Sequence, residues 1–358
     1  MKVVSLSLDH KILESDSEVS QRANQYGDLV AKYLVAIPGA SKHIKLSDKT
    51  TIVAAGGGNK FVSFFRLRNY LRKILNKEKF DLITIQDPYF LAVLGLCLAK
   101  KFHLKSEIQI HGFEKLSGIR KFLAKKNLRR ADLIRVVSER LKQRLIADFK
   151  VAENKIYIAP VGIDVVKIEN SRPNLKFKEK YQNKFIFLTV SRLVEVKNIQ
   201  LQIKALAKLN NKNIQLLIAG EGSEKDNLQK LVAEYNLQSQ VDFIGWLDDL
   251  GSVYKIADCF LLTSNSEGYG MVIAEAVLAD LPVIMTDVGV AGELVRDDVN
   301  GCIVAVNDLE TLQQKMGPLI KDKDLLAKFK VNSDKFKHKI LNKSDLINKV
   351  VDHWKSVV

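Results

Sequence analysis

Residues 259–276, CFLLTSNSEGYGMVIAEA, decide the class of fold. The apolar run Cys259–Ser264 predicts a buried strand, and the run from Met271 predicts a helix, with a short turn between them. Gly268 and Gly270 let the backbone of this turn approach a ligand closely. The free N–H groups at the start of a helix suit a phosphate. The stretch therefore predicts a strand–turn–helix unit with an anion site at its turn.

Two carboxylates flank the same turn. Glu267 would lie in the loop, and Glu275, eight residues later, about one turn into the helix, so both could reach one bound molecule. Carboxylates are good acceptors for the hydroxyl groups of a sugar. The alternative is an ordinary loop with two solvated glutamates, because short motifs also occur by chance.

The rest of the chain alternates strand-like and helix-like runs in the same way, which is typical of parallel α/β sheets. Strands are expected at 3–8, 33–38, 51–55, 81–86, 107–111, 133–138 and 155–160, and again at 185–191, 214–220, 241–245, 259–264 and 282–286. Two consecutive α/β runs of roughly equal length predict two Rossmann-like, doubly wound α/β domains facing a cleft, and ligands of such sheets bind at the carboxyl ends of the strands.

A polar, charged stretch at 170–184, NSRPNLKFKEKYQNK, interrupts this alternation. We therefore expect an N-terminal acceptor-side domain at 1–165, a linker at 166–184 and a C-terminal ligand-binding domain at 185–335. Residues 336–358 would form C-terminal helices, for which packing back on the N-terminal domain is one option.

Length and composition describe a soluble globular protein with room for two domains: 358 residues, 47% of them hydrophobic and 27% charged. Cys97, Cys259 and Cys302 stand alone in apolar runs, so buried free thiols in a reducing compartment are expected. Met1–Leu6 reads as a first strand and not as a signal peptide. A cytoplasmic location follows as an expectation.

The net charge of +15 is unevenly distributed. Residues 1–165 hold 30 Lys and Arg against 16 Asp and Glu, whereas residues 166–358 hold 26 against 25. The segments Phe61–Lys79 and Lys115–Arg130 interleave these cations with phenylalanine, leucine and isoleucine. Such segments can lie peripherally on an anionic membrane surface, or they can be ordinary helices with a charged outer face. We do not expect a nucleic-acid partner, because no nucleic-acid motif accompanies the charge.

Several blocks resemble the family 4 retaining glycosyltransferases (glycosyl transferases group 1), which have the two-domain GT-B fold. SEGYGMVIAEA resembles that family's Glu-x7-Glu motif, SEGFGxxxxEA. Further blocks match in the right order: Pro160–Asp164, Ser191–Leu193 with Glu195, Lys197 and Asn198, Ala219–Gly222, Phe243–Gly245, Thr286–Gly289 with Glu293, and Asn300-Gly301.

The resemblance implies a transferase of the hexosyltransferase type (EC 2.4) that moves a sugar from a nucleotide-diphosphate sugar to a hydroxyl of a saccharide or lipid-linked acceptor. Arg192 and Lys197 would hold the diphosphate, without a metal or another cofactor. Glu275 would bind the ribose and Glu267 would lie near the donor sugar. The work would belong to cell-surface polysaccharide or glycolipid synthesis.

The resemblance also implies roles for several backbone positions. The amides of Gly268, Tyr269 and Gly270 would lie near sugar and phosphate, and Gly220 and Gly222 would leave room for the base. In the first half, His111 would point at the donor sugar, although a packing histidine is the alternative. The glycine-rich loop usual after the first strand is missing here, which leaves the acceptor side less defined.

Two other classes of protein remain as alternatives. One is another GT-B enzyme, such as a sugar-nucleotide epimerase. The other is a basic protein that binds membranes or nucleic acid without catalysis. Asp322-Lys323-Asp324 has the form DxD used by metal-dependent glycosyltransferases, but no strand precedes it, so we interpret it as surface charge.

Overall fold

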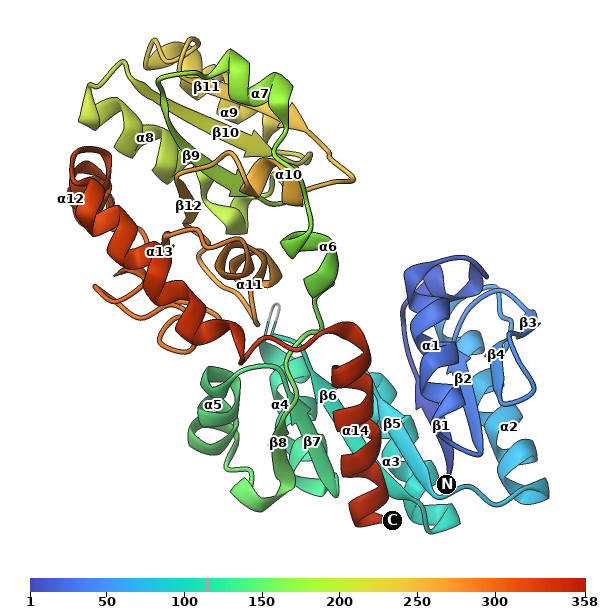
Figure 1. Ribbon diagram of the computed structural model, residues 1–358. Coiled ribbons are helices and arrows are strands. Elements are labelled where there is room, and N and C mark those ends of the chain that lie inside the picture. Colours follow the sequence, from blue (N-terminus) through green and yellow to red (C-terminus); the bar gives the residue numbers. More distant parts are fainter. Residues whose placement is uncertain (114–115) are drawn as a thin grey trace. The chain divides into compact units, whose positions relative to one another are not determined.

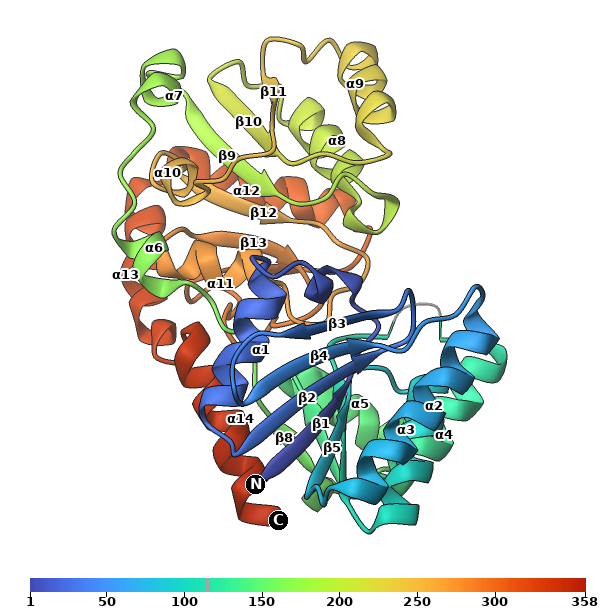
Figure 2. The same cartoon turned by 90° about the vertical axis from the view of Figure 1, so that its right-hand side faces the viewer.

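The computed structural model describes residues 1–113 and 116–358 and forms two compact units, each built on its own sheet (Figures 1 and 2). Unit 1 comprises Met1–Pro160 and Lys343–Val358, and unit 2 comprises Val161–Asn342. The predicted class, two Rossmann-like α/β domains, is confirmed. Lys115, at the start of the second basic segment, lies outside the described residues.

The sheet of unit 1 has the order β3-β4-β2-β1-β5-β6-β7-β8. Its strands are β1 (Lys2–Leu6), β2 (Lys32–Ile37), β3 (Lys42–Lys45), β4 (Thr50–Ala54), β5 (Leu82–Ile85), β6 (Lys105–Ile110), β7 (Leu133–Val136) and β8 (Ile156–Ile158). All neighbours pair in parallel except β3, which pairs antiparallel with β4. Parallel strands lie on both sides of β1. The carboxyl ends of all the parallel strands therefore lie at the same edge of the sheet.

The helices of unit 1 form two groups. The helices α2 (Lys60–Lys77), α3 (Phe90–Phe102), α4 (Gly118–Arg130) and α5 (Glu139–Phe149) contact one another in chain order, whereas α1 (Glu18–Asp28) contacts α14 (Lys343–Val357). The chain moves from β4 towards β8 through the first group, and right-handed crossovers place these helices on one face. Figure 2 shows α2, α3 and α4 side by side.

The last helix, α14, packs in unit 1 through a buried tryptophan. Trp354 is fully buried and stacks on Tyr26 at 5.3 Å between ring centroids. Its indole N–H donates to Oε1 of the buried Glu107 on β6 over 2.8 Å. The C-terminal helix is therefore hydrogen-bonded to a central strand of the sheet, at a residue 247 positions earlier in the sequence.

The sheet of unit 2 has the order β11-β10-β9-β12-β13-β14, and every pair is parallel. Its strands are β9 (Phe185–Val190), β10 (Ile214–Ala219), β11 (Val241–Gly245), β12 (Cys259–Leu262), β13 (Val283–Thr286) and β14 (Gly301–Val304). Its helices are α6 (Val165–Glu169), α7 (Leu175–Lys180), α8 (Ile199–Leu209), α9 (Lys225–Glu234), α10 (Gly251–Tyr254), α11 (Met271–Leu278), α12 (Leu309–Lys321) and α13 (Lys323–Lys337). Strand residues such as Phe187 and Leu216 form the core with α8 and α12.

The structure differs from the sequence-based expectations in four places. The unit boundary falls after Pro160, and residues 166–184, expected as a linker, include the helices α6 and α7 of unit 2. The strands β3 and β14 were not expected. Cys259 and Cys302 are buried, but the expectation for Cys97 is wrong, because its side chain lies on the exposed side of α3.

Candidate active site

The candidate site lies at the carboxyl edge of the unit 2 sheet, where the strand order reverses. From β9 the chain moves outward through β10 and β11, and it then returns to form β12 on the other side of β9. The loops after β9 and β12 therefore diverge, and such a switch point is where open α/β sheets bind ligands. Arg192 and Lys197 follow β9, and Glu267 follows β12.

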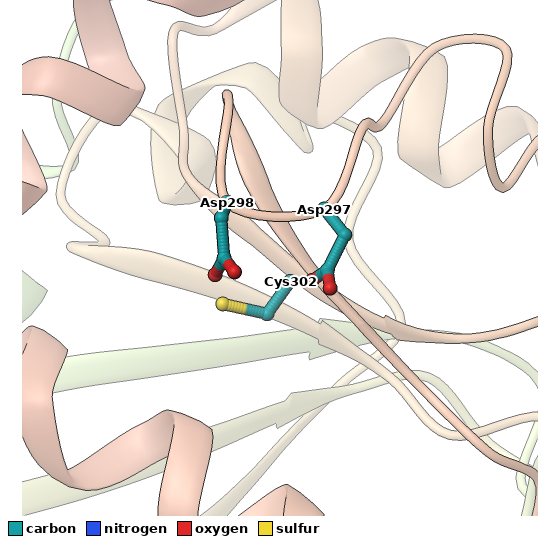
Figure 3. A group of neighbouring side chains, drawn as sticks. All are labelled: Asp297, Asp298 and Cys302. Atoms are coloured by element: carbon teal, nitrogen blue, oxygen red, sulfur yellow. The ribbon is translucent and has the colours of Figure 1, made fainter.

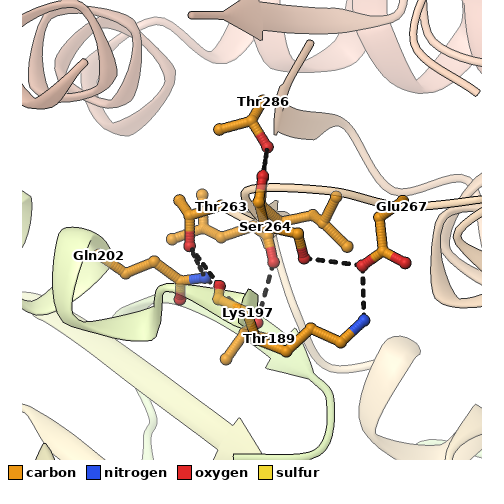
Figure 4. A network of polar contacts seen from close by, with 9 residues as sticks. Thr189, Lys197, Gln202, Thr263, Ser264, Glu267 and Thr286 are labelled. Atoms are coloured by element: carbon orange, nitrogen blue, oxygen red, sulfur yellow. Dashed lines mark hydrogen bonds and ion pairs between the residues drawn. The ribbon is translucent and has the colours of Figure 1, made fainter. Parts of the chain in front are cut away.

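Lys197 and Glu267 meet across this switch point. Nζ of Lys197 lies 2.5 Å from Oε1 of Glu267, and the side chains are only 17% and 12% exposed (Figure 4). The hydroxyl of Ser264 donates to the same carboxylate oxygen over 2.7 Å. The sequence indicated both charged residues, but not that they form one partly buried ion pair.

The loop that holds Lys197 is fixed by a buried asparagine. Asn198 adopts a left-handed backbone with φ of 48°, and its amide donates to the side-chain oxygens of Asn265 and Asn307 over 3.2 and 2.7 Å. The hydroxyl of Thr263 donates to the carbonyl of Asn198 over 3.0 Å. These bonds attach the loop after β9 to the loop after β12.

Further hydrogen bonds between buried side chains and the backbone connect the strand ends around the site, as Figure 4 shows. The amide of Gln202 on α8 donates to the hydroxyls of Thr189 and Thr263 over 3.3 and 2.9 Å. The hydroxyl of Thr286, at the end of β13, donates to the carbonyl of Ser264 over 2.6 Å. Three neighbouring strand ends are thus held in one geometry, as a preorganised site requires.

Two glycines bring the next loop against the first. A Cβ atom on Gly220 would lie 1.9 Å from the carbonyl oxygen of Ser191, and one on Gly222 would lie 2.3 Å from that of Leu193. Only glycine fits at such distances. The role implied for these glycines was to leave room for a base, whereas the structure shows that they first allow the backbones after β9 and β10 to touch.

Two polar side chains directly after β9 are available to a ligand. The hydroxyl oxygen of Ser191 is buried and, within the described part of the chain, has no hydrogen-bond partner. Arg192 is exposed, and its guanidinium makes no ion pair with residues 1–113 or 116–358. Buried polar groups without partners are rare in proteins. Both observations fit a site that an anionic, hydrogen-bonding ligand completes.

In the turn before α11, the side chain of Tyr269 is buried, so the backbone is the part of the turn that can face a ligand. Gly270 has a φ of 91°, which suits glycine, and directly precedes the helix. The ring of Tyr269 is buried, and its carbonyl accepts from the N–H of Val290 over 3.2 Å. A Cβ atom on Gly289 would lie 2.5 Å from that carbonyl oxygen. The Thr286–Glu293 block thus shapes the turn by packing on it.

Glu275 lies on the first turns of α11, half-buried, and a fully buried tyrosine positions it. The hydroxyl of Tyr254 on α10 donates to Oε2 of Glu275 over 2.8 Å. Burial, together with the charge of Glu275, raises the pKa of Tyr254 well above its usual value, so Tyr254 remains a donor. Sequence reasoning missed Tyr254, because nothing in SVYKIAD distinguishes it from a core aromatic residue.

His111 belongs to unit 1, directly after β6, so it is described apart from the residues of unit 2. Its ring is exposed to solvent. Neighbouring protein atoms remove part of the water around the imidazole, and this desolvation, followed by the charges of Arg135 and Arg22, lowers the pKa of His111 to about 4. His111 is therefore expected to be neutral at pH 7.

Two family models match the chain in succession. The model described as Glycosyltransferase Family 4 matches residues 36–167, and the model described as Glycosyl transferases group 1 matches residues 171–336. The second match contains the whole candidate site of unit 2. The chain belongs to the family 4 glycosyltransferases, and it is therefore a transferase. The stretch from Glu267 to Glu275, which resembles the family's Glu-x7-Glu motif, lies within this second match.

The glycosyltransferase is also similar to named proteins. It is 30% identical to an uncharacterised glycosyltransferase of Methanocaldococcus jannaschii over 44% of this chain and 40% of that protein. It is 27% identical to the UDP-Gal:α-D-GlcNAc-diphosphoundecaprenol α-1,3-galactosyltransferase of Escherichia coli over 78% of this chain and 76% of that one. The chain thus spans less than half of the first relative and about three quarters of the second.

The structural similarity extends over the entire chain. The crystal structure of Anabaena HepE in complex with UDP matches with a TM-score of 0.83 and 18% identity, and the match covers 100% of both chains. At this identity the match shows the fold, which is the predicted GT-B fold.

One group of potential metal ligands occurs among the described residues of the glycosyltransferase, and it lies outside the candidate site. Asp297, Asp298 and Cys302 bring ligand atoms within 4.8 Å of one another (Figure 3). Nζ of Lys315 already lies 2.9 Å from Asp298 and 3.7 Å from Asp297. Burial raises the pKa of the Cys302 thiol to about 12, so it is not a thiolate. The group is better explained as an ion-paired turn.

The other acidic motif is a helix cap. Asp322, the first residue of the DxD sequence, is exposed at the start of α13 and accepts from the N–H of Leu325 over 2.9 Å. Its position agrees with our interpretation as surface charge. Among the described residues, no helix is both long and apolar enough to cross a membrane.

Proposed function

We propose that this glycosyltransferase transfers a hexose from a nucleotide-diphosphate sugar to an acceptor hydroxyl, with retention of configuration at the anomeric carbon. The observation that supports this most directly is the Lys197–Glu267 ion pair across the switch point of unit 2. Arg192 and the start of α11 flank the same two loops. A cation, a carboxylate and free backbone N–H groups are what a diphosphate and an attached sugar need.

The diphosphate is assigned to Lys197, Arg192 and the start of α11. Negative charge grows on the departing diphosphate as the bond to the anomeric carbon breaks. Fixed cations and a helix N-terminus stabilise that charge without reorganising during the reaction. We therefore propose a reaction that does not depend on a metal ion. Glu267, held by Ser264, would then face hydroxyl groups of the donor sugar.

The ribose is assigned to Glu275. The hydroxyl of Tyr254 donates to Oε2 of Glu275 and orients the carboxylate, and a carboxylate held in this way is a good acceptor for ribose hydroxyls. Ser191, whose hydroxyl has no hydrogen-bond partner among the described residues, lies where the loop after β9 meets Gly220, on the side assigned to the base.

Retention is proposed to follow a front-face path. The bond between the anomeric carbon and the diphosphate breaks through an oxocarbenium-like state. The acceptor oxygen bonds to the same face of that carbon, and its proton passes to an oxygen of the leaving diphosphate. Atoms and charge then balance without a covalent enzyme intermediate, and the protein contributes positioning and charge stabilisation.

The acceptor is proposed to be a saccharide or a lipid-linked saccharide used in cell-surface polysaccharide or glycolipid synthesis. The E. coli relative is named for an undecaprenol-diphosphate acceptor, which supports the lipid-linked option. The protein would then work in the cytoplasm and touch the inner face of the cell membrane through its basic unit 1.

Incubation with a panel of nucleotide sugars, followed by NMR of the products, tests this proposal. We expect release of a nucleoside diphosphate from one donor, and the same anomeric configuration in donor and product. The K197A variant serves as the inactive control. Inverted configuration would refute retention, and conversion of the donor to an isomer without release of nucleotide would favour an epimerase.

A further inference from the structure

The helices α2, α3 and α4 form an unusually basic layer on one face of unit 1. Together they contain fourteen Lys and Arg residues and no Asp or Glu. The helices of the other face, α1 and α14, mix both signs, with acids such as Glu18 and Asp352. The positive excess of the N-terminal half is therefore gathered on one face and is not spread over the unit.

The large hydrophobic side chains of this layer that are exposed lie at one end of it. Phe61 is 90% exposed, Phe65 58%, Phe90 52%, and Ile119 and Phe122 are each 64% exposed. Each lies within the first six residues of its helix. Because β4, β5 and β6 run parallel, the helices that follow them all begin at the carboxyl edge of the sheet.

Contacts between the helices join their first turns into one surface. The guanidinium of Arg120 on α4 lies over the ring of Tyr89, 5.4 Å from its centroid, directly before α3. The amide of Asn127 on α4 donates to the carbonyls of Pro88 and Tyr89 over 2.9 and 2.8 Å. The helix α2 in turn contacts α3. We call Phe61, Phe65, Phe90, Ile119 and Phe122, with the surrounding cations, the basic-aromatic rim.

Core packing does not explain the rim. The helix α2 fills the core of unit 1 with Leu67, Leu71 and Leu75, and α4 does so with Ala124 and Leu128. The rim residues occupy other positions of the same helices and remain in solvent. A group of exposed aromatic residues of this kind marks an interaction surface.

We infer that the basic-aromatic rim docks unit 1 on an anionic lipid bilayer. Lysine and arginine attract acidic headgroups, while phenylalanine and isoleucine enter the interface between headgroups and acyl chains. A nucleic acid is disfavoured as the occupant, because no nucleic-acid-binding motif accompanies the charge of these helices. No carboxylate lies on the three helices to repel acidic lipids.

Docking by the rim has a consequence for the acceptor, and this step rests on the proposed function. The rim begins where β4, β5 and β6 end, and His111 follows β6 at the same edge. A bilayer held there would present the headgroup of a lipid-linked acceptor to the edge of unit 1 that α/β proteins use for ligands.

Vesicle sedimentation of the full chain tests the inference. Wild-type protein is compared with the variant F61S/F65S/I119S/F122S on phosphatidylcholine vesicles with and without phosphatidylglycerol, at low and high salt. We expect at least tenfold tighter binding of wild type to the anionic vesicles, weaker binding at high salt, and at least tenfold weaker binding of the variant. L175S/V331S, which alters equally exposed apolar residues of unit 2, is the matched control and should bind as wild type does.

A second measurement separates this inference from the proposed function. Release of nucleoside diphosphate from the donor in lipid-free buffer should be unchanged in the rim variant, and an unchanged melting temperature would show that it folds. Equal and negligible binding of wild type to both vesicle types at low salt would overturn the inference. Binding to RNA or DNA but not to vesicles would also overturn it. Vesicle binding without donor turnover would instead contradict the proposed function alone.

Discussion

The ammonium of Lys197 lies 2.5 Å from the carboxylate of Glu267, so two side chains assigned to the donor already neutralise each other across the switch point. In the proposed donor complex, the diphosphate would compete with Glu267 for Lys197 and release Glu267 to accept hydrogen bonds from the sugar. The pair would then couple recognition of the phosphate to recognition of the sugar. This coupling can be measured, because each partner can be removed separately.

The first prediction concerns that pair and Arg192. Replacing Lys197 or Arg192 by alanine removes a charged hydrogen-bond partner and should weaken binding of the cognate nucleoside diphosphate by about 1.5–3 kcal/mol in calorimetry. The control is K208A, because Lys208 also pairs with a carboxylate, Glu310, but on exposed helix surfaces. Unchanged affinity in both site variants would contradict the assignment of the diphosphate.

The second prediction tests the ribose. If Glu275 binds the diol, wild type should prefer the ribonucleotide over its 2′-deoxy analogue, and E275A should lose that preference. Y254F should weaken ribonucleotide binding by about 1 kcal/mol, because the hydroxyl that orients Glu275 is lost while the ring remains. Y181F is the matched control, since the hydroxyl of Tyr181 bonds Asp242 instead. A preference that survives in E275A would place the ribose elsewhere.

Much of this site is visible in the sequence, because its loops follow apolar strands and use glycine and charge in local patterns. Glu267 and Glu275 stand out in that way, whereas Arg192 and Lys197 are indicated by the resemblance to the family 4 glycosyltransferases. Tyr254 and Ser191 could not, since their importance arises from contacts between segments distant in the chain. The same limit explains why local patterns did not predict the bond between Trp354 and Glu107, which spans 247 positions.

The fold shows a similar division. Strands in the middle of each sheet are mostly apolar, although β6 also holds the buried Glu107 and Gln109, and all of them were predicted. The edge strand β3, KHIK, has one apolar residue and pairs antiparallel with β4, so periodicity does not indicate it. Cys97 was misjudged because α3 is apolar on most of its surface, so composition does not reveal its exposed side.

The third prediction uses the glycines that bring two loops together. G220A would place a Cβ atom 1.9 Å from a backbone oxygen at a φ of 132°, so the loops after β9 and β10 must separate. We expect a destabilisation of about 1–3 kcal/mol and loss of nucleotide binding. G58A is the control, since its Cβ atom would meet nothing within 4 Å and its φ is not positive. Equal melting temperatures for the two variants would contradict this account.

The fourth prediction concerns the attachment of α14 to unit 1. W354F keeps an aromatic ring in the stack but leaves Oε1 of the buried Glu107 without the indole donor, which should cost about 1–3 kcal/mol in unfolding free energy. W354A also opens a cavity and should cost about 3–5 kcal/mol. W246A, at a tryptophan that is 73% exposed, is the control and should change stability little. A W354A variant as stable as W246A would show that α14 is not needed by unit 1.

The last prediction concerns metal ions. In the proposed reaction, Lys197, Arg192 and the start of α11 would supply the positive charge that metal-dependent glycosyltransferases obtain from a cation held by a DxD motif. Asp322 is instead engaged as the cap of α13. Release of nucleoside diphosphate should therefore persist in excess EDTA, because no step of the proposed reaction uses a metal ion. We expect a rate within about twofold of the untreated enzyme, which corresponds to about 0.4 kcal/mol of transition-state stabilisation. D322A tests the motif independently: it should lower the melting temperature slightly, through loss of the cap, and leave turnover unchanged. Loss of activity in EDTA that manganese or magnesium restores would contradict the charge assignment, and loss of turnover in a folded D322A variant would show that the motif has a role in the reaction.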